Sequence, residues 1–216
     1  MAKYGKYTGN QLEDFLNKIG GEAVIDQMLS GKDLVVVEWP SLQRPPITAE
    51  QAMPAPFQFK SARTIKLGLH KTPAEYRKAL KAAKVDVGVY AGQILDKITI
   101  AKEVIEVDIS KSFTVADLGY TTSTTRYDVI KKRIVECGGE LCPNEVGPAD
   151  RLQNLDQPKE DWYRTAMEPL SDSDDVLGVF HLEHHGDGLH LRSYDGDDGA
   201  LCNPYGRFVC VVPRKK

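Results

Sequence analysis

The sequence has few cysteines and few aromatic residues, and it has no long apolar run. Its 216 residues include four cysteines, and aromatic residues make up 8% of the chain. The spacing of Cys137, Cys142, Cys202 and Cys210 is not that of a zinc ribbon. No apolar run approaches the roughly 18 residues that a membrane span needs. We therefore expect no membrane partner.

The first residues also lack the apolar stretch of a secretory signal, since residues 1–6 read Met-Ala-Lys-Tyr-Gly-Lys. In a protein that is not exported, cysteines generally stay reduced. We therefore predict a cytoplasmic protein with free thiols. A Cys142–Cys202 or a Cys137–Cys210 disulfide is the open alternative.

Signatures of catalysis are missing as well. The sequence contains no H-E-x-x-H zinc motif and no glycine-rich phosphate loop. Cys142 is a conceivable nucleophile, but Cys142-Pro143 does not open a helix that would lower the pKa of the thiol. A buried structural cysteine is the favoured interpretation. Nothing here assigns a reaction to the chain.

What the sequence does contain predicts an α+β protein in three parts. Residues 1–39 have the spacing of a helical hairpin followed by a short strand. Residues 40–59 include five prolines and read as a linker. Residues 60–216 are predicted to form an α+β domain that ends in an antiparallel β-meander.

Within that domain, residues 63–69 alternate like a half-buried strand, with Ile65, Leu67 and Leu69 on one face. Thr72-Pro73-Ala74-Glu75 has the pattern of a capping box and predicts a helix to about residue 84. A second helix start is predicted at Thr125. Residues 141–148 read as an irregular connection, and residues 162–170 as a strand.

The meander centres on residues 176–212. A two-residue turn, either Gly186-Asp187 or Asp187-Gly188, would join strands at 176–185 and 189–194. Side chains of a strand alternate between its faces. One face is therefore predicted to be apolar, and it collects Phe180, Leu182, Leu189 and Leu191. The solvent-exposed face collects His181, Glu183, His185, His190 and Arg192.

Two interpretations of that polar face stay open. Imidazoles beside a carboxylate could bind zinc or a similar metal, with His181, Glu183, His185 and His190 as ligands. The favoured alternative is an exposed polar face in which Glu183 pairs with a histidine or an arginine across the strands. The following acidic loop, residues 195–199, could bind calcium, although its spacing is not that of an EF-hand and a plain acidic turn is favoured.

Charge is divided unevenly along the domain. Residues 60–84 carry eight basic residues against Glu75, whereas residues 160–199 carry eleven acidic residues against two arginines. Such a division can steer a polyanion towards the basic region, or it can reflect two solvated faces of one molecule. The candidate polyanion-binding residues are Lys60, Arg63, Lys66, Lys71, Arg77, Lys78, Lys81 and Lys84.

Several short motifs resemble an uncharacterised bacterial protein family that is common in candidate-phyla genomes. They are Thr64-Ile65-Lys66-Leu67-Gly68, Glu140-Leu141-Cys142-Pro143, Glu145-Val146-Gly147-Pro148, Arg151-Leu152-Gln153, Gln157-Pro158, Ala166-Met167-Glu168-Pro169, Asp172-Ser173-Asp174 and Arg207-Phe208-Val209. The resemblance spans about residues 60–216 and implies a shared fold but no activity. The chain departs from that pattern at Arg63 and His190, where relatives are expected to carry aromatic residues. More loosely, the C-terminus resembles C-type-lectin-like folds.

The leading hypothesis is a non-catalytic recognition protein. It would present the basic 60–84 surface, the polar 181–199 face, or both, to a nucleic acid, another polyanion or a protein. The alternative is a metal-dependent hydrolase whose His181, Glu183, His185 and His190 hold the ion that activates water.

Overall fold

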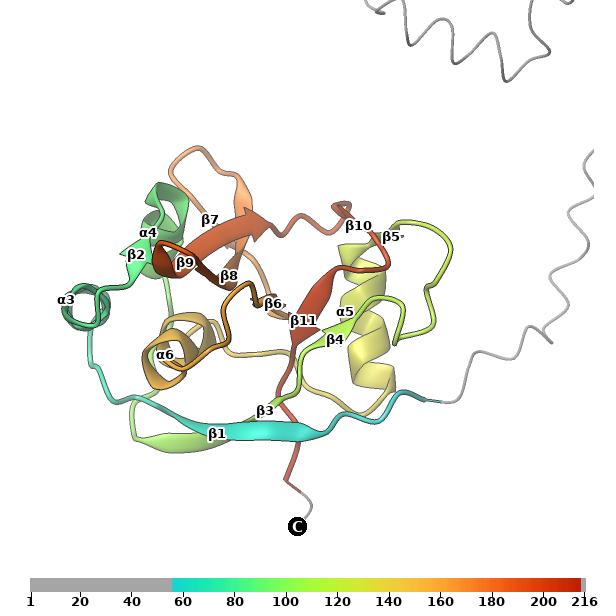
Figure 1. Cartoon of the computed structure of the whole chain (residues 1–216), viewed down its shortest axis with the longest axis horizontal. Helices are drawn as coiled ribbons and strands as arrows, with labels where there is room; N and C mark the ends of the chain where they lie inside the picture. The colour runs from blue at the N-terminus through green and yellow to red at the C-terminus, as the bar shows by residue number, and fades with distance from the viewer. Residues whose placement is uncertain (1–55, 215–216) are drawn as a thin grey trace, which may run out of the picture. The chain divides into compact units, whose positions relative to one another are not determined.

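Residues 56–214 are the part of the chain that the structure, a computed structural model, describes. They form four helices and eleven strands, which confirms the α+β class (Figure 1). In chain order these are β1 (Ser61–Leu67), α3 (Pro73–Ala82), β2 (Asp86–Val87), α4 (Val89–Leu95), β3 (Ile105–Ser110), β4 (Phe113–Thr114), β5 (Thr125–Arg126), α5 (Tyr127–Glu136), α6 (Val146–Gln153), β6 (Trp162–Thr165), β7 (Leu170–Ser171), β8 (Leu177–His185), β9 (Gly188–Asp195), β10 (Leu201–Cys202) and β11 (Arg207–Val209). The predicted helical hairpin and strand of residues 1–39 lie outside the described residues.

The main sheet has the strand order β2-β9-β8-β6-β11-β4, and β7 also pairs with β8. It is a mixed sheet, because β2 runs parallel to β9 and β11 runs parallel to β6. The predicted antiparallel meander is therefore wrong beyond the β8–β9 hairpin. The closing strand β11 leaves the hairpin and inserts between β6 and β4, which are distant in sequence. Sequence alternation carries no information about such a crossover.

The β8–β9 hairpin follows the predicted turn. His185 pairs with Gly188, so the turn consists of Gly186 and Asp187. Gly188 has a φ of +133°, a conformation that L side chains rarely adopt and glycine permits. Leu182 pairs with Leu191 and Glu183 pairs with His190, so the two predicted faces are confirmed.

The apolar face of the hairpin packs against two helices. Phe180, Leu182 and Leu191 have no exposed surface. Helix α6 contacts β8 and β9 on one side and β1 on the other, so that it lies between the main sheet and the β1–β3 ribbon (Figure 1). Helix α4 contacts the same two strands. Burying each of these side chains stabilises the fold by about 1.5–3 kcal/mol.

The irregular connection predicted for residues 141–148 is confirmed for residues 141–145 but wrong for residues 146–148, which begin helix α6. Gly147 and Pro148 suggested a loop, but Pro148 lies in the first turn, where backbone N–H groups have no helical partner and proline is tolerated. Gly147 is required by packing, since a Cβ there would lie 2.3 Å from the Phe180 ring. The two residues that looked like helix breakers thus fit the start of a helix pressed against the sheet.

Helix α3 begins as predicted. Thr72 Oγ1 accepts a hydrogen bond from the backbone N–H of Glu75 at 3.2 Å. Glu75 Oε2 reaches back to the N–H of Lys71 at 2.8 Å, one residue before the position of a standard capping box. Helix α5 begins at Tyr127 without a side-chain cap, so its predicted start at Thr125 is two residues early, with Thr125 itself in β5.

Two further predictions fail at element ends. Phe57 and Phe59, assigned to the linker, lie against the core, with the Phe59 ring 4.9 Å from that of Phe113. Leu69 was placed with Ile65 and Leu67, but it is 47% exposed because β1 ends before Gly68, whose φ is +75°.

None of the four described helices has the length and apolar character that crossing a membrane requires.

Candidate functional site

The polar sheet face consists of His181, Glu183 and His185 on β8 and His190 and Arg192 on β9. Cross-strand neighbours share a face of the sheet, and His181 pairs with Arg192 as Glu183 does with His190. The structure therefore brings all five predicted side chains together. Only part of this face is exposed, however, since His181 is 8% and His190 3% accessible. The prediction of an exposed face is wrong for these two imidazoles.

Glu183 contacts three other side chains of this face. One of its carboxylate oxygens lies 3.1 Å from His181 Nε2 and 3.3 Å from His185 Nε2. The other lies 3.4 Å from Arg192 Nε. The carboxylate is thus surrounded by cationic or polar nitrogens, as the favoured interpretation from the sequence predicted.

His190 has partners at both ring nitrogens. Nδ1 lies 2.6 Å from Arg192 Nη2 and 3.2 Å from Asp86 Oδ2. Because a guanidinium only donates hydrogen bonds, the shorter contact makes Nδ1 the acceptor and assigns the ring proton to Nε2. Nε2 then donates to Asp187 Oδ1 at 2.9 Å. Arg192 also pairs with Asp86 at 2.7 Å. These bonds leave His190 no lone pair for a metal.

The predicted metal centre is not found. Within residues 56–214, no group of three or more histidine, cysteine, aspartate or glutamate side chains could hold a metal ion. The reason is visible at His190, whose nitrogens are used in hydrogen bonds, and at Glu183, which is shared with Arg192. The acidic loop is closed on itself: Asp195 Oδ1 accepts from the N–H of Asp197, and Asp197 Oδ1 from that of Gly199. This geometry is that of the plain acidic turn that the sequence favoured over a calcium site.

His181 and His185 of β8 have opposite pKa shifts. Burial lowers the pKa of His181, and the charge of Arg164 adds to this while Glu183 opposes it. The pKa of His185 is raised, because hydrogen bonds and charges from Glu160 and Glu183 outweigh a desolvation effect that lowers it. At neutral pH His181 is therefore an uncharged ring within a polar cluster.

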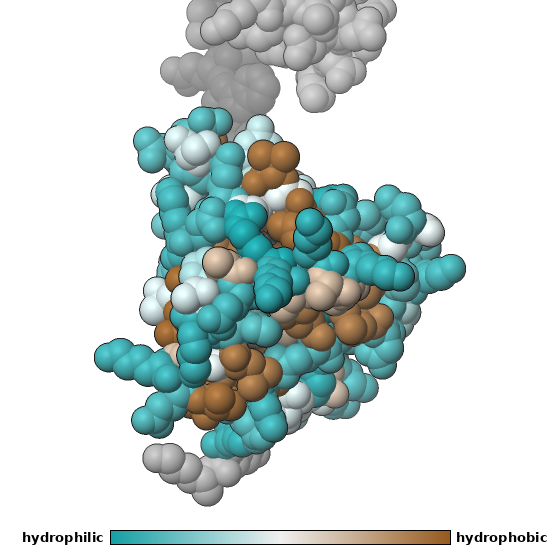
Figure 2. All heavy atoms as spheres, turned by 90° about the vertical axis from the view of Figure 1, so that its left-hand side faces the viewer, coloured by the Kyte–Doolittle hydropathy of each residue, from teal (hydrophilic) through white to brown (hydrophobic). Residues whose placement is uncertain are grey.

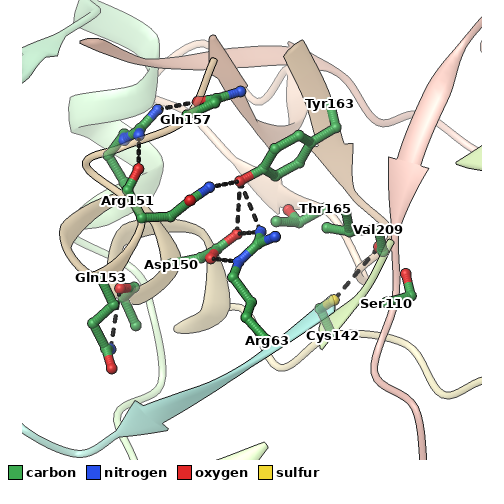
Figure 3. A network of polar contacts seen from close by, with 12 residues as sticks. Arg63, Ser110, Cys142, Asp150, Arg151, Gln153, Gln157, Tyr163, Thr165 and Val209 are labelled. Atoms are coloured by element: carbon green, nitrogen blue, oxygen red, sulfur yellow. Dashed lines mark hydrogen bonds and ion pairs between the residues drawn. The ribbon is translucent and has the colours of Figure 1, made fainter. Parts of the chain in front are cut away.

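The basic surface predicted at residues 60–84 is divided by the fold. Arg63 points inward from β1 and pairs with Asp150 of α6, whose side chain has no exposed surface (Figure 3). Arg63 Nη2 also donates to Tyr163 Oη at 2.8 Å, and that hydroxyl donates to Asp150 Oδ2 at 3.0 Å. Burial lowers the pKa of Arg63, but Asp150 more than offsets it, and the pKa is raised. Arg63 is a structural ion-pair residue.

Two more members of the basic set have partners. Arg77 pairs with Asp96 at 2.7 Å and donates to the carbonyl of Gly92. Lys71 Nζ donates to the carbonyl of Gly68 at 2.8 Å. Neither of these side chains is fully available to a ligand.

The remaining five lysines are exposed, and their side chains have no hydrogen-bond or ion-pair partner among the described residues. Three of them follow one another along α3 and its end, while Tyr76 and Leu80 turn the opposite face of the helix inward. Figure 2 looks onto the side of the molecule where α3 and α4 lie, and shows a largely hydrophilic surface with hydrophobic patches between. We call Lys60, Lys66, Lys78, Lys81 and Lys84 the open lysines.

No protein-family model, no curated protein sequence and no solved structure matches the chain. The resemblance to a bacterial family therefore stays a prediction.

The structure adds residues to the polar face that the sequence analysis did not name. Trp162 and Arg164 of β6 pair with Glu183 and His181 across the sheet. The rings of Trp162 and His181 are stacked, with centroids 5.5 Å apart and planes at 6°. Residues 162–170 were predicted as a strand, so alternation would have placed both side chains on one face. Which strand lay beside them was not readable from the sequence.

All four cysteines are free thiols. Cys142 is buried, and this burial raises the pKa of its thiol far above the usual value. Burial likewise raises the pKa of Cys210 to about 12. A thiol with a raised pKa is a poor nucleophile at neutral pH, because the thiolate is the reactive form. The geometry supports the structural role predicted for Cys142.

Proposed function

We propose that the protein is a non-catalytic recognition protein that binds a nucleic acid or another polyanion through the open lysines. The observation that carries this proposal is that these five ammonium groups are exposed and lack carboxylate partners in the part of the chain described. By contrast, Arg63 and Arg77, from the same region, are taken up by ion pairs within the fold. The cations left over are those that an anionic partner could neutralise.

The arrangement on α3 supports contact with a phosphate backbone rather than sequence reading. Lys78 and Lys81 are three residues apart on a helix, so they lie on the same side, and Lys84 follows at its end. Lysines placed this way neutralise phosphates and release counterions without contacting base edges. Tyr76 of α3 is buried, so Tyr90 of α4, 57% exposed, is the nearest exposed large aromatic side chain in sequence. Binding is therefore expected to depend on salt and little on sequence.

The four free thiols are consistent with a reducing compartment, which supports the cytoplasmic location that we propose. The polar sheet face is not needed for this function. Most of its charges are balanced by each other.

A filter-binding titration of the full chain against single-stranded DNA, double-stranded RNA and heparin tests the proposal. Binding that weakens steeply with salt is expected for at least one of them. The double variant Lys78→Gln/Lys81→Gln should weaken that binding. The matched control is Lys132→Gln/Lys159→Gln, which removes two exposed lysines elsewhere. Absence of salt-dependent binding at low ionic strength, or an equal loss in both double variants, would refute the proposal.

A further inference from the structure

Arg164 is a buried cation without a carboxylate. It is 6% exposed, and among residues 56–214 no aspartate or glutamate forms an ion pair with it. Its Nε has no hydrogen-bond partner in that part of the chain, and Nη1 contacts Cys202 Sγ at 3.5 Å. A guanidinium stays charged in proteins, and a sulfur is a weak acceptor. Arg164 is therefore short of both charge and hydrogen-bond partners.

The other arginines nearby show what the fold normally provides. Arg63 has the carboxylate of Asp150. Arg151, with no exposed surface, also has an Nε without a partner among the described residues, but both of its terminal nitrogens donate to oxygen atoms, Gln157 Oε1 and the carbonyl of Asn154. An unpaired buried charge is costly, so the incomplete environment of Arg164 calls for an explanation.

Aromatic rings supply what compensation there is. The guanidinium carbon lies 3.4 Å from the centre of the Tyr194 ring, with Phe208 at 5.5 Å and Trp162 at 5.9 Å. The Tyr194 side chain is 46% exposed and lies near the end of β9. It therefore covers Arg164 while almost half of its own surface is exposed to solvent.

His181 is a second unsatisfied polar group beside Arg164. Its ring is stacked between Trp162 and Tyr194, at 5.5 Å and 6.0 Å. Nε2 lies 3.1 Å from Glu183 Oε2 without forming a hydrogen bond, and Nδ1 has no hydrogen-bond partner among the described residues either. Two unsatisfied donors, one of them cationic, thus lie under a single movable aromatic ring.

We infer that Arg164 and His181 form a binding site for a carboxylate group, covered by Tyr194 in this structure. The carboxylate would accept hydrogen bonds from the Arg164 guanidinium and from one ring nitrogen of His181. Because Arg164 Nε is buried, entry requires Tyr194 to rotate outward. The cation–aromatic contact of Arg164 is then exchanged for a charge-assisted hydrogen bond, which is the stronger interaction.

The surroundings select the ligand class. One guanidinium beside an uncharged imidazole matches a single negative charge. Glu183, 3.1 Å from His181, repels a doubly charged phosphate. The flat ring of Trp162, which stacks on His181, favours a carboxylate on an aromatic or apolar body. This site is separate from the open lysines, so either one can fail without the other.

The test uses 19F NMR of 4-fluorobenzoate with the full chain, and 4-fluorobenzamide as an uncharged probe of the same shape. Saturable binding of the benzoate but not of the amide is expected. Tyr194→Ala should tighten it about tenfold, since the covering contact no longer has to be broken. Arg164→Gln should weaken it about tenfold or more. Arg77→Gln, which removes a cation paired with Asp96 on the exposed side of α3, is the matched control and should change little.

Competition then separates two sources of the carboxylate. Displacement by an acetylated tripeptide with a free C-terminus, but not by its amidated form, assigns the site to peptide ends. Displacement by acetate alone assigns it to small acids. Equal binding of the two fluorinated probes, or no binding even to Tyr194→Ala, overturns the inference. If Arg164→Gln does not fold, the comparison of the two probes and the binding to Tyr194→Ala still test the carboxylate site.

Discussion

Arg63 and Asp150 join the outer strand β1 to helix α6 through an ion pair whose acid is fully buried. Replacing Asp150 with asparagine leaves a mostly buried guanidinium without its counter-charge. We predict a loss of about 3 kcal/mol in the free energy of unfolding. Urea unfolding of the wild type and the variant measures it.

The control for that substitution is Asp96→Asn, which breaks the ion pair of Asp96 with Arg77. Both side chains are well exposed there, at 58% and 42%, so the loss should be at most about 1 kcal/mol. Equal losses in the two variants would mean that burial of the carboxylate is not what makes the Arg63–Asp150 pair important.

The pKa of His181 is expected to lie below the ordinary histidine value of roughly 6.5, and the pKa of His185 above it. Burial lowers the pKa of His181, so its contribution to stability falls as pH drops below the unfolded value. Glu160 and Glu183 raise the pKa of His185, so its contribution is present at low pH and is lost as pH rises through the folded pKa.

NMR titration of the imidazole Cε1–H signals measures both pKa values directly, with His181→Gln and His185→Gln to assign them. In urea-unfolded chain the two signals should titrate together. A pKa of His181 above that of His185 in the folded protein would contradict the placement of His181 within the stacked cluster.

At the scale of elements, α6 depends on a glycine. A Cβ at Gly147 would lie 2.3 Å from the Phe180 ring. Phe180 is fully buried, so neighbouring side chains prevent its ring from moving aside. Gly147→Ala should therefore destabilise the fold by about 1–3 kcal/mol, although alanine is the better helix former. Gly186→Ala is the control, because a Cβ in that turn meets nothing within 4 Å. Thermal or urea unfolding compares them, and equal stability would refute the close approach of α6 to β8.

The N-terminus of α3 allows a smaller prediction. Thr72 Oγ1 satisfies the N–H of Glu75, so Thr72→Ala should cost about 1 kcal/mol. Thr72→Asp, which retains an acceptor, should retain most of the stability in the same urea titration. A loss in Thr72→Asp as large as in Thr72→Ala would show that the cap bond is not what matters.

Local patterns predicted local structure in this chain. The Thr72-Pro73-Ala74-Glu75 motif gave the start of α3, and alternation with a glycine turn gave the β8–β9 hairpin and its two faces. These features depend on residues within a few positions of one another.

What the sequence could not supply is long-range. The parallel pairing of β11 with β6 and the burial of His181 and His190 depend on chain segments tens of residues away. Asp150 and Tyr163, the partners that draw Arg63 out of the basic surface, lie 87 and 100 residues from it. For that reason the sequence analysis counted Arg63 among the candidate polyanion-binding residues. It also did not predict that Arg164 lies beside His181, Trp162 and Tyr194.

For the described part of the molecule, the open lysines and the exposed charges of the polar face differ in how they are paired. The open lysines have no partners among the described residues, whereas Arg192, Glu183 and Asp86 form one connected set on the polar face. Only the first kind of surface gains strongly from meeting an anionic polymer, because its counterions are released on binding.

The salt dependence of polyanion binding tests this account most directly. The slope of log K against log salt concentration should be shallower in Lys78→Gln/Lys81→Gln than in the wild type. The slope should fall by about 1.4 to 1.8, because two fewer phosphates are neutralised. Lys132→Gln/Lys159→Gln should keep the wild-type slope. An unchanged slope in the α3 variant would contradict the proposal that the open lysines bind the polyanion.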